Sequence, residues 1–118
     1  MTDYSKMSGF EINKAVGLAT GEATASEPVF NQVIRNSTGR EFNPCNSWAD
    51  AGPIMEANRI SLDFDGEYFG GKPSGMVGAY IYNYSNNRMI RGPRLQSPCR
   101  AICITFLMMK DTENANPS

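Results

Sequence analysis

The chain has 118 residues, with 11 basic and 12 acidic side chains that almost cancel, so no overall field would draw it to nucleic acid or to an anionic membrane. It contains no histidine, which excludes the Ser-His-Asp and Cys-His catalytic arrangements and most zinc sites. We therefore expect a single domain over residues 1–118, not an enzyme, without cofactor or metal.

Cysteine usage and hydropathy indicate the compartment. Three cysteines, an odd number, are too few for a disulfide framework and agree with a reducing environment. The longest apolar run, residues 101–109, is about half of what spans a bilayer, and no charged-then-apolar signal peptide opens the chain. These features favour a cytoplasmic protein that does not enter a membrane.

The first helix is expected to begin after Ser8, because Ser8 and Glu11 have the spacing of a capping box. Apolar residues then recur on one face, and Gly21 is placed to end the helix. Residues 20–42 are less regular. They are interpreted either as an edge hairpin that pairs residues 29–34 with 40–42, or as a flexible loop.

A second helix is expected over residues 47–58, with Asn46 or Ser47 as its cap and a bend at Gly52-Pro53. Residues 60–64 alternate in hydropathy, and Asp65-Gly66 is typical of a type I′ turn that would return the chain through residues 67–69. Further strands are expected at residues 76–84 and 88–91, joined by a turn at 85–87. The result is a small antiparallel meander.

The last helix is expected to be the centre of the core. Ser97 is a natural N-cap, Pro98 suits a first turn, and Lys110 suits the negative end of the helix dipole. Between Ala101 and Met109 only Thr105 is polar, and a helix that is apolar all round is normally buried. Residues 111–118 are expected to fray. The fold class is therefore α+β, with about three helices packed on the meander.

Four arginines form the first candidate binding site. No acidic residue occurs between Tyr68 and Met109, whereas this stretch holds Arg88, Arg91, Arg94 and Arg100. Guanidinium groups together with the free amides of the last helix would bind an anion or a phosphate-bearing partner. The alternative is that the arginines pair with the acidic hairpin across the sheet or lie solvated.

Aromatic residues form further candidates. Tyr80, Tyr82 and Tyr84 share one face of a strand and would stack on a ligand or bind a protein, unless they pack under a helix. Trp48, with Asn46 beside it, would anchor a partner if exposed, although a lone tryptophan is more often in the core. The three cysteines, Cys45, Cys99 and Cys103, make a poor metal site and are expected to be buried thiols.

Three blocks of the sequence resemble the NinX family of lambda-like bacteriophages, small accessory proteins of the "nin" region. The blocks are residues 3–16, residues 43–55 with 58–62, and residues 97–109. The sequence departs from that family at Pro98-Cys99-Arg100 and Cys103, and over residues 20–42 and 66–96. The resemblance implies an early phage accessory protein in the bacterial cytoplasm, and it implies no activity. A looser similarity to small phage domains described as α-β-α sandwiches supports a sandwich-like layering.

Three functions follow from these observations. The first is a non-catalytic protein that binds a host or phage protein. The alternative is a small-molecule binder that captures a nucleotide or nucleotide-derived signal, an anionic ligand, with the four arginines and a tyrosine or Trp48. Nucleic-acid binding is weaker, because the net charge is −1. Whether the chain forms a homo-oligomer stays open.

Replacing Phe106 by Asp tests the central role of the last helix. A carboxylate at a position that we expect to be buried would have to lose its hydration without a partner, so we expect Phe106→Asp to be insoluble on expression. Sedimentation of the lysate and thermal unfolding of any soluble fraction measure this. A soluble variant that melts cooperatively would contradict the core assignment.

Overall fold

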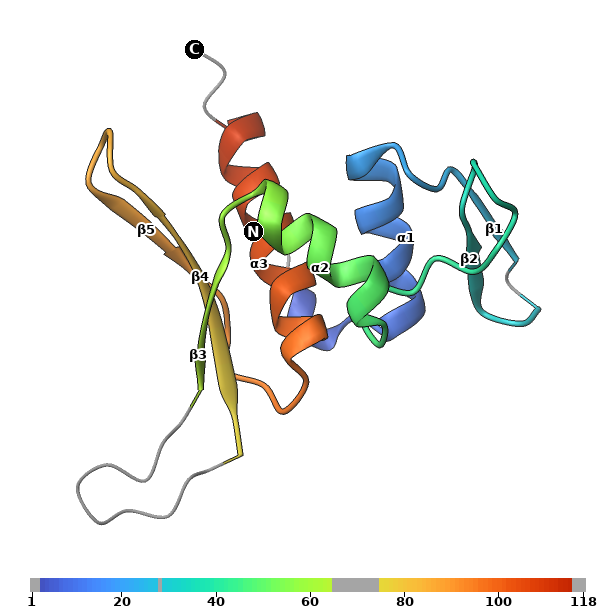
Figure 1. Cartoon of the computed structure of the whole chain (residues 1–118), viewed down its shortest axis with the longest axis horizontal. Coiled ribbons are helices and arrows are strands. Elements are labelled where there is room, and N and C mark those ends of the chain that lie inside the picture. Colours follow the sequence, from blue (N-terminus) through green and yellow to red (C-terminus); the bar gives the residue numbers. More distant parts are fainter. Residues whose placement is uncertain (1–2, 28, 65–74, 116–118) are drawn as a thin grey trace.

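The computed structural model describes residues 3–27, 29–64 and 75–115. These residues form one short 3-10 helix, three α-helices and two antiparallel sheets (Figure 1), so the fold class is α+β, as predicted. The elements in chain order are η1 (Tyr4–Lys6), α1 (Gly9–Thr20), β1 (Ala25–Glu27), β2 (Gln32–Ile34), α2 (Trp48–Ala57), β3 (Ser61–Phe64), β4 (Val77–Asn83), β5 (Arg88–Arg91) and α3 (Pro98–Ala115).

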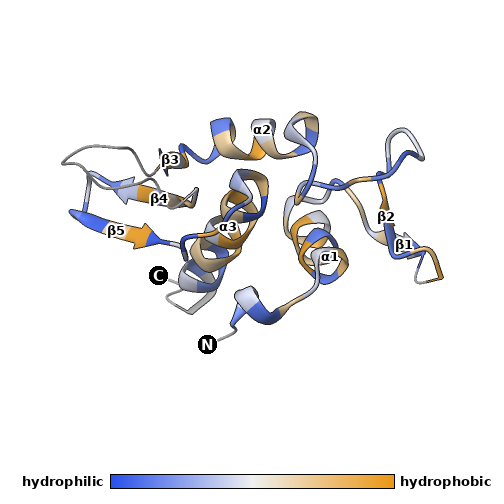
Figure 2. Cartoon of the chain, turned by 90° about the horizontal axis from the view of Figure 1, so that it is seen from below, coloured by the Kyte–Doolittle hydropathy of each residue, from blue (hydrophilic) through white to orange (hydrophobic). Residues whose placement is uncertain are grey.

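The helices lie between the two sheets. β3, β4 and β5 form a meander in that order, while β1 and β2 form a separate hairpin at the other end of the molecule (Figure 2). α3 packs against β4 and β5, α1 and α2 pack against α3, and β2 contacts α1. The expected α-β-α layering is therefore not found among the described residues. The physical reason is that α3 is apolar on all sides and needs cover from a sheet on one side and from helices on the other.

The middle of α3 is buried, as its sequence predicts. Every residue from 101 to 107 is at most 4% exposed, including Thr105. The Thr105 hydroxyl donates a hydrogen bond to the Ala79 carbonyl of β4 at 3.3 Å, which satisfies the only polar side chain in this segment. At the start of the helix, the Arg100 amide donates to the Ser97 Oγ at 3.2 Å, so Ser97 is the expected cap.

The end of α3 corrects the prediction. The helix continues to Ala115, whereas residues 111–118 were expected to fray; residues 116–118 lie outside the described part of the chain. Two contacts explain the longer helix. The Tyr4 hydroxyl donates to Asp111 Oδ2 at 2.5 Å, and Lys110 lies 3.3 Å from the Glu113 carboxylate one turn on. None of the helices in the described ranges combines the length and the apolarity that crossing a bilayer needs.

The first two α-helices lie where they were predicted. The Glu11 amide donates to the Ser8 Oγ at 3.1 Å, and Gly21 ends α1 with a φ of 76° in the left-handed region. α2 continues through Gly52 and Pro53. Ser47 is its cap residue, although its hydroxyl makes no capping hydrogen bond.

The hairpin expected in residues 20–42 is present, and a strand that was not predicted pairs with its other edge. Residues 40–42 return beside residues 33–35, with a bridge from Ile34 to Glu41 and backbone hydrogen bonds from the Arg35 amide to the Arg40 carbonyl at 2.8 Å and from the Phe42 amide to the Val33 carbonyl at 2.7 Å. On the other side, Ala25–Glu27 pairs with Gln32–Ile34. Val29 and Phe30 lie in the turn instead of a strand, because Asn31 adopts a φ of 52° that breaks the extended backbone there. The expected return of residues 40–42 is thus confirmed, whereas the first strand is shorter than expected and its pairing with Ala25–Glu27 was not predicted.

The three-stranded sheet agrees with the expected strands. β4 and β5 match the predicted segments within a residue at each end, and Asn83 pairs with Arg88 across their turn. β3 pairs with β4 in the described residues, with Leu62 opposite Ala79. The predicted turn and return at residues 65–69 lie outside the part of the chain that the structure describes.

Gly92 tests the contact between α3 and the sheet. A Cβ built on Gly92 would overlap the Thr105 hydroxyl, whereas a Cβ on Gly52 in α2 meets nothing within 4 Å. We expect Gly92→Ala to lower the free energy of unfolding by about 1 to 3 kcal/mol. The matched variant Gly52→Ala should be neutral or more stable by roughly 0.5 to 1 kcal/mol. Urea unfolding measures both free energies. An unchanged free energy of unfolding for Gly92→Ala would show that Thr105 of α3 does not pack this closely against Gly92.

Candidate functional site

The tyrosine face of the sheet is open to solvent. Ala79 of β4 is fully buried toward α3, so the alternate residues Tyr80, Tyr82 and Tyr84 face the other way. Tyr84 is 89% exposed, and no helix of the described residues covers this side. The expectation that the rings pack under a helix is therefore wrong. The reason is that α3 packs on the opposite face of the sheet, and α1 and α2 pack on α3.

The rings on this face also contact one another. The centroids of Tyr82 and Tyr84 are 4.6 Å apart in an edge-on arrangement, and the Tyr82 hydroxyl donates to Asn87 Oδ1 in the adjacent turn. Met89 lies opposite Tyr82 on β5 and is 46% exposed. We call the outward side of β4 and β5, with these residues and Arg91, the outer sheet face.

Two of the four candidate arginines meet on this face. Arg91 Nη1 lies 3.8 Å and Arg94 Nη1 3.3 Å from Asp63 Oδ2 of β3, and Arg94 also donates to the Asp63 carbonyl at 3.2 Å. The Arg91 guanidinium lies over the Tyr80 ring, 5.2 Å from its centroid. For Arg91 and Arg94 the structure thus shows the pairing with the acidic hairpin that the sequence offered as the alternative.

The other two arginines lie elsewhere. Arg100, in the first turn of α3, donates to the carbonyl of Met7 at 2.5 Å and to that of Ser5 at 3.4 Å, and so attaches the N-terminal segment to the core. Arg88 is the first residue of β5, on the side that faces α3, and borders a cleft there. The four guanidinium groups therefore do not converge on one pocket.

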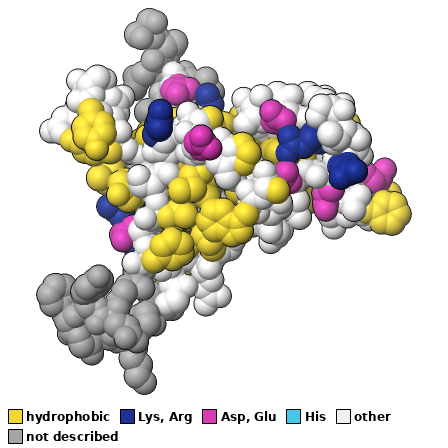
Figure 3. All heavy atoms as spheres, viewed as in Figure 1, with side chains coloured by type: hydrophobic (Ala, Val, Ile, Leu, Met, Phe, Trp, Pro, Cys, Tyr) yellow, Lys and Arg dark blue, Asp and Glu magenta, His cyan; other side chains and the backbone are white. Residues whose placement is uncertain are grey.

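Trp48 is on the surface, against the expectation that it is in the core. It stands in the first turn of α2 and is 51% exposed, because α2 turns Ala51 and Ile54 toward α3 instead. Hydrophobic side chains gather around α2 and the beginning of α3 in Figure 3. Asn46 is also exposed, and its amide nitrogen donates to Asn43 Oδ1 at 3.1 Å. Trp48 and Asn46 thus lie away from the outer sheet face.

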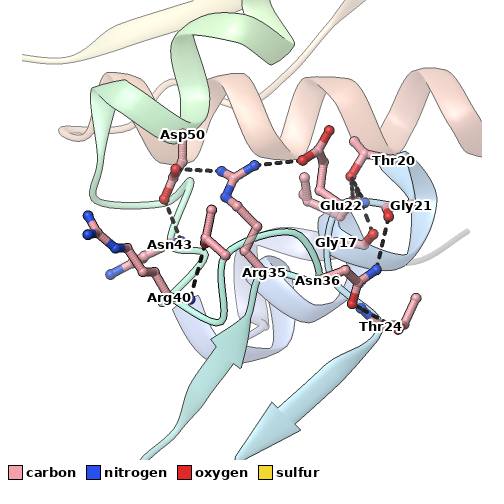
Figure 4. Close-up of polar contacts among 12 residues, drawn as sticks. Gly17, Thr20, Gly21, Glu22, Thr24, Arg35, Asn36, Arg40, Asn43 and Asp50 are labelled. Atoms are coloured by element: carbon pink, nitrogen blue, oxygen red, sulfur yellow. Dashed lines mark hydrogen bonds and ion pairs between the residues drawn. The ribbon is translucent and has the colours of Figure 1, made fainter.

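A polar network that the sequence did not reveal lies between α1, β2 and α2 (Figure 4). Arg35 bridges Glu22 Oε2 at 2.6 Å and Asp50 Oδ1 at 2.7 Å, and its guanidinium lies over the Phe42 ring at 4.8 Å. The other oxygen of Asp50 accepts the Asn43 amide at 2.9 Å. Separations of 13 and 15 residues left no periodic signal that could have predicted these pairs.

This network borders a pocket of about 280 Å³ between the ends of α1 and α2. Its charged groups already bind one another, since both carboxylates bind Arg35. The arrangement is what a structural clamp requires, because it joins the hairpin segment to two helices with charge-assisted hydrogen bonds.

The three cysteines are buried thiols, as predicted. Hydrogen bonding between the side chains of Cys45 and Cys103 lowers the pKa of the Cys45 thiol and raises the pKa of Cys103, and burial raises the pKa of Cys99. Cys99 and Cys103 therefore stay protonated near neutral pH and pack as small apolar groups. Within the described ranges, no cluster of three or more His, Cys, Asp or Glu residues is placed to hold a metal ion.

The single tryptophan permits a direct test of its exposure. We expect strong quenching of its emission by iodide in the folded protein and only a small change on unfolding. Trp48→Ala should lower the free energy of unfolding by less than about 1 kcal/mol, against roughly 3 to 5 kcal/mol for a buried tryptophan. If iodide did not quench the emission, or if Trp48→Ala lost several kcal/mol of stability, the ring would be in the core.

Comparison with known families is consistent with the resemblance in the sequence. The model of the family described as Bacteriophage P22, NinX matches residues 3–110. The match includes both sheets, all three α-helices up to Lys110 and every candidate residue discussed above. A comparison with curated proteins finds no match. Since the family match covers nearly the whole chain, the chain belongs to the phage NinX family.

Proposed function

We propose that this NinX family member is a non-catalytic accessory protein that acts early in infection, in the host cytoplasm, by binding a host or phage protein through its outer sheet face. The observation that carries the proposal is the open, aromatic character of this face. Tyr84 and Met89 are exposed beside Tyr82, and Arg91 lies next to them. Tyrosine, methionine and arginine are the residues enriched at protein interfaces and their hot spots.

The side chains of the outer sheet face are already held in place before a partner binds. Tyr82 is held by Tyr84 and Asn87, and Arg91 is held by Asp63 and the Tyr80 ring. Side chains that are ordered before binding lose less conformational entropy when a partner arrives. The absence of histidine from the chain supports binding over catalysis.

Charge distinguishes a protein partner from a nucleic acid. Asp63 neutralises part of the charge of Arg91 and Arg94, so the outer sheet face is less basic than its arginines alone suggest. Nucleic-acid binding depends on several unpaired cations that release counterions from phosphates. A protein with an apolar, partly acidic surface is the better fit. Small-molecule capture by all four arginines finds no support, because they are spread over different parts of the molecule.

A double variant tests this function. Tyr84→Ser with Met89→Ser removes the most exposed apolar groups of the outer sheet face, and Leu18→Ser, at a 57% exposed position on α1, is the matched control. Each immobilised variant is incubated with a nuclease-treated lysate of infected cells. We expect the wild-type chain and Leu18→Ser to retain the same partner protein from this lysate. For the double variant, the dissociation constant of that purified protein should rise about tenfold or more.

Retention that the double variant leaves unchanged would contradict the use of this face. Retention that disappears after nuclease treatment, or that falls steeply with salt, would assign the face to nucleic acid instead. Thermal unfolding of all three proteins checks that the substitutions leave the fold intact.

A further inference from the structure

A cleft of about 510 Å³ lies between the turn end of the β4–β5 hairpin and the C-terminal half of α3. This size is typical of small-molecule sites, which range from about 300 to 1,000 Å³. Ile81 and Ile90 pair across the two strands and, with Met109 of α3, provide its apolar lining. Most of its lining comes from the side of the sheet that faces α3, although Met89 of the outer sheet face also borders it.

On the side of the β4–β5 turn, the polar groups at the rim of the cleft are hydrogen-bond donors. Asn83 Oδ1 accepts from the amide and hydroxyl of Ser85 at 2.9 and 2.6 Å, and Asn86 Oδ1 accepts from the Arg88 amide at 3.1 Å. The turn thus uses both side-chain oxygens. Within the described residues, the two side-chain NH₂ groups and the Arg88 guanidinium have no hydrogen-bond or ion-pair partner.

On the α3 side the cleft is also lined by Thr112 and Glu113. The Thr112 hydroxyl donates to the Met108 carbonyl at 3.0 Å, and the Glu113 carboxylate binds Lys110 at 3.3 Å. Lys110 offsets the charge of Glu113, and Arg88 has no carboxylate within ion-pair distance among the described residues, so the cleft carries an unpaired positive charge. The cleft therefore combines an apolar lining with a rim that presents one cation and two amide donors. These groups match a ligand that is anionic at one end and apolar at the other.

We propose that this cleft binds a small amphiphilic anion, a carboxylate or phosphate monoester on an aliphatic or aromatic body. The guanidinium fork of Arg88 binds two oxygens of the anion, as arginine does with carboxylates and phosphates. The side-chain NH₂ groups of Asn83 and Asn86 add neutral hydrogen bonds, and the body of the ligand packs on Ile81, Ile90 and Met109. This proposal does not rest on the protein-binding face proposed above, although Met89 borders both surfaces.

Isothermal titration with four probes tests the proposal: octanoate, octyl phosphate, octylammonium and inorganic phosphate. We expect the two octyl anions to bind the wild-type chain, and octylammonium and inorganic phosphate to bind much more weakly. The stronger of the two anions then identifies the headgroup. Failure of both octyl anions to bind would overturn the proposal, as would equal binding of octylammonium or inorganic phosphate.

A matched pair of variants assigns the binding to the cleft. Arg88→Gln removes the rim cation, and Arg91→Gln makes the same change three residues away on the same strand, on the opposite side of the sheet. Both side chains are exposed, so neither change should unfold the protein. We expect Arg88→Gln to weaken octyl anion binding roughly tenfold to a hundredfold and Arg91→Gln to leave it unchanged. Equal effects of the two variants would show that the cleft is not the site.

Discussion

The burial of α3 determines how the rest of the chain is arranged. Residues 101–107 have no side that can face water, so they must be enclosed completely. Thr105 adds a positional requirement, because its hydroxyl has to reach the Ala79 carbonyl while Gly92 leaves room for it. The sheet supplies one side of the enclosure, and α1 and α2 supply the other.

One consequence of this arrangement is an uncovered sheet face. α1 and α2 both pack against α3, so no helix is left in the described residues to cover the outward side of β4 and β5. Tyr84 and Met89 are exposed there, and Asp63 holds the neighbouring arginines in place. The same packing leaves a cleft where the hairpin extends beyond its contact with α3, with Arg88 at its rim. The outer sheet face and the cleft at Arg88 thus both result from the way in which the helices and the sheet enclose α3.

Polar contacts attach the periphery to this core. Arg35 joins the β1–β2 segment to α1 and α2, and Arg100 joins the N-terminal segment to α3. The buried amide of Asn13 links α1 to the loop before α2 through Asn43 and the amide of Cys45, at 2.8 and 3.0 Å. Asn43 and Cys45, which lie in one of the blocks that resemble the NinX family, therefore have a structural role.

The sequence by itself determined the elements whose causes are local. Ser8 and Gly21 bounded α1, Ser97 began α3, and the apolar run after it marked the core, because capping and hydropathy act over a few residues. The family could also be inferred from short blocks of sequence, and the family comparison agrees.

Only the tertiary structure decided which faces stay open and which charges meet. Trp48 is exposed, and the tyrosines are uncovered, because the helices turn their apolar sides to α3 and not to these rings. Arg94 meets Asp63 across 31 residues, and Arg35 meets Asp50 across 15, while Arg88 and Arg100 lie apart. Such pairs depend on how the strands and helices are positioned in space. Residues that are distant in the sequence have no local pattern from which their contact could be predicted.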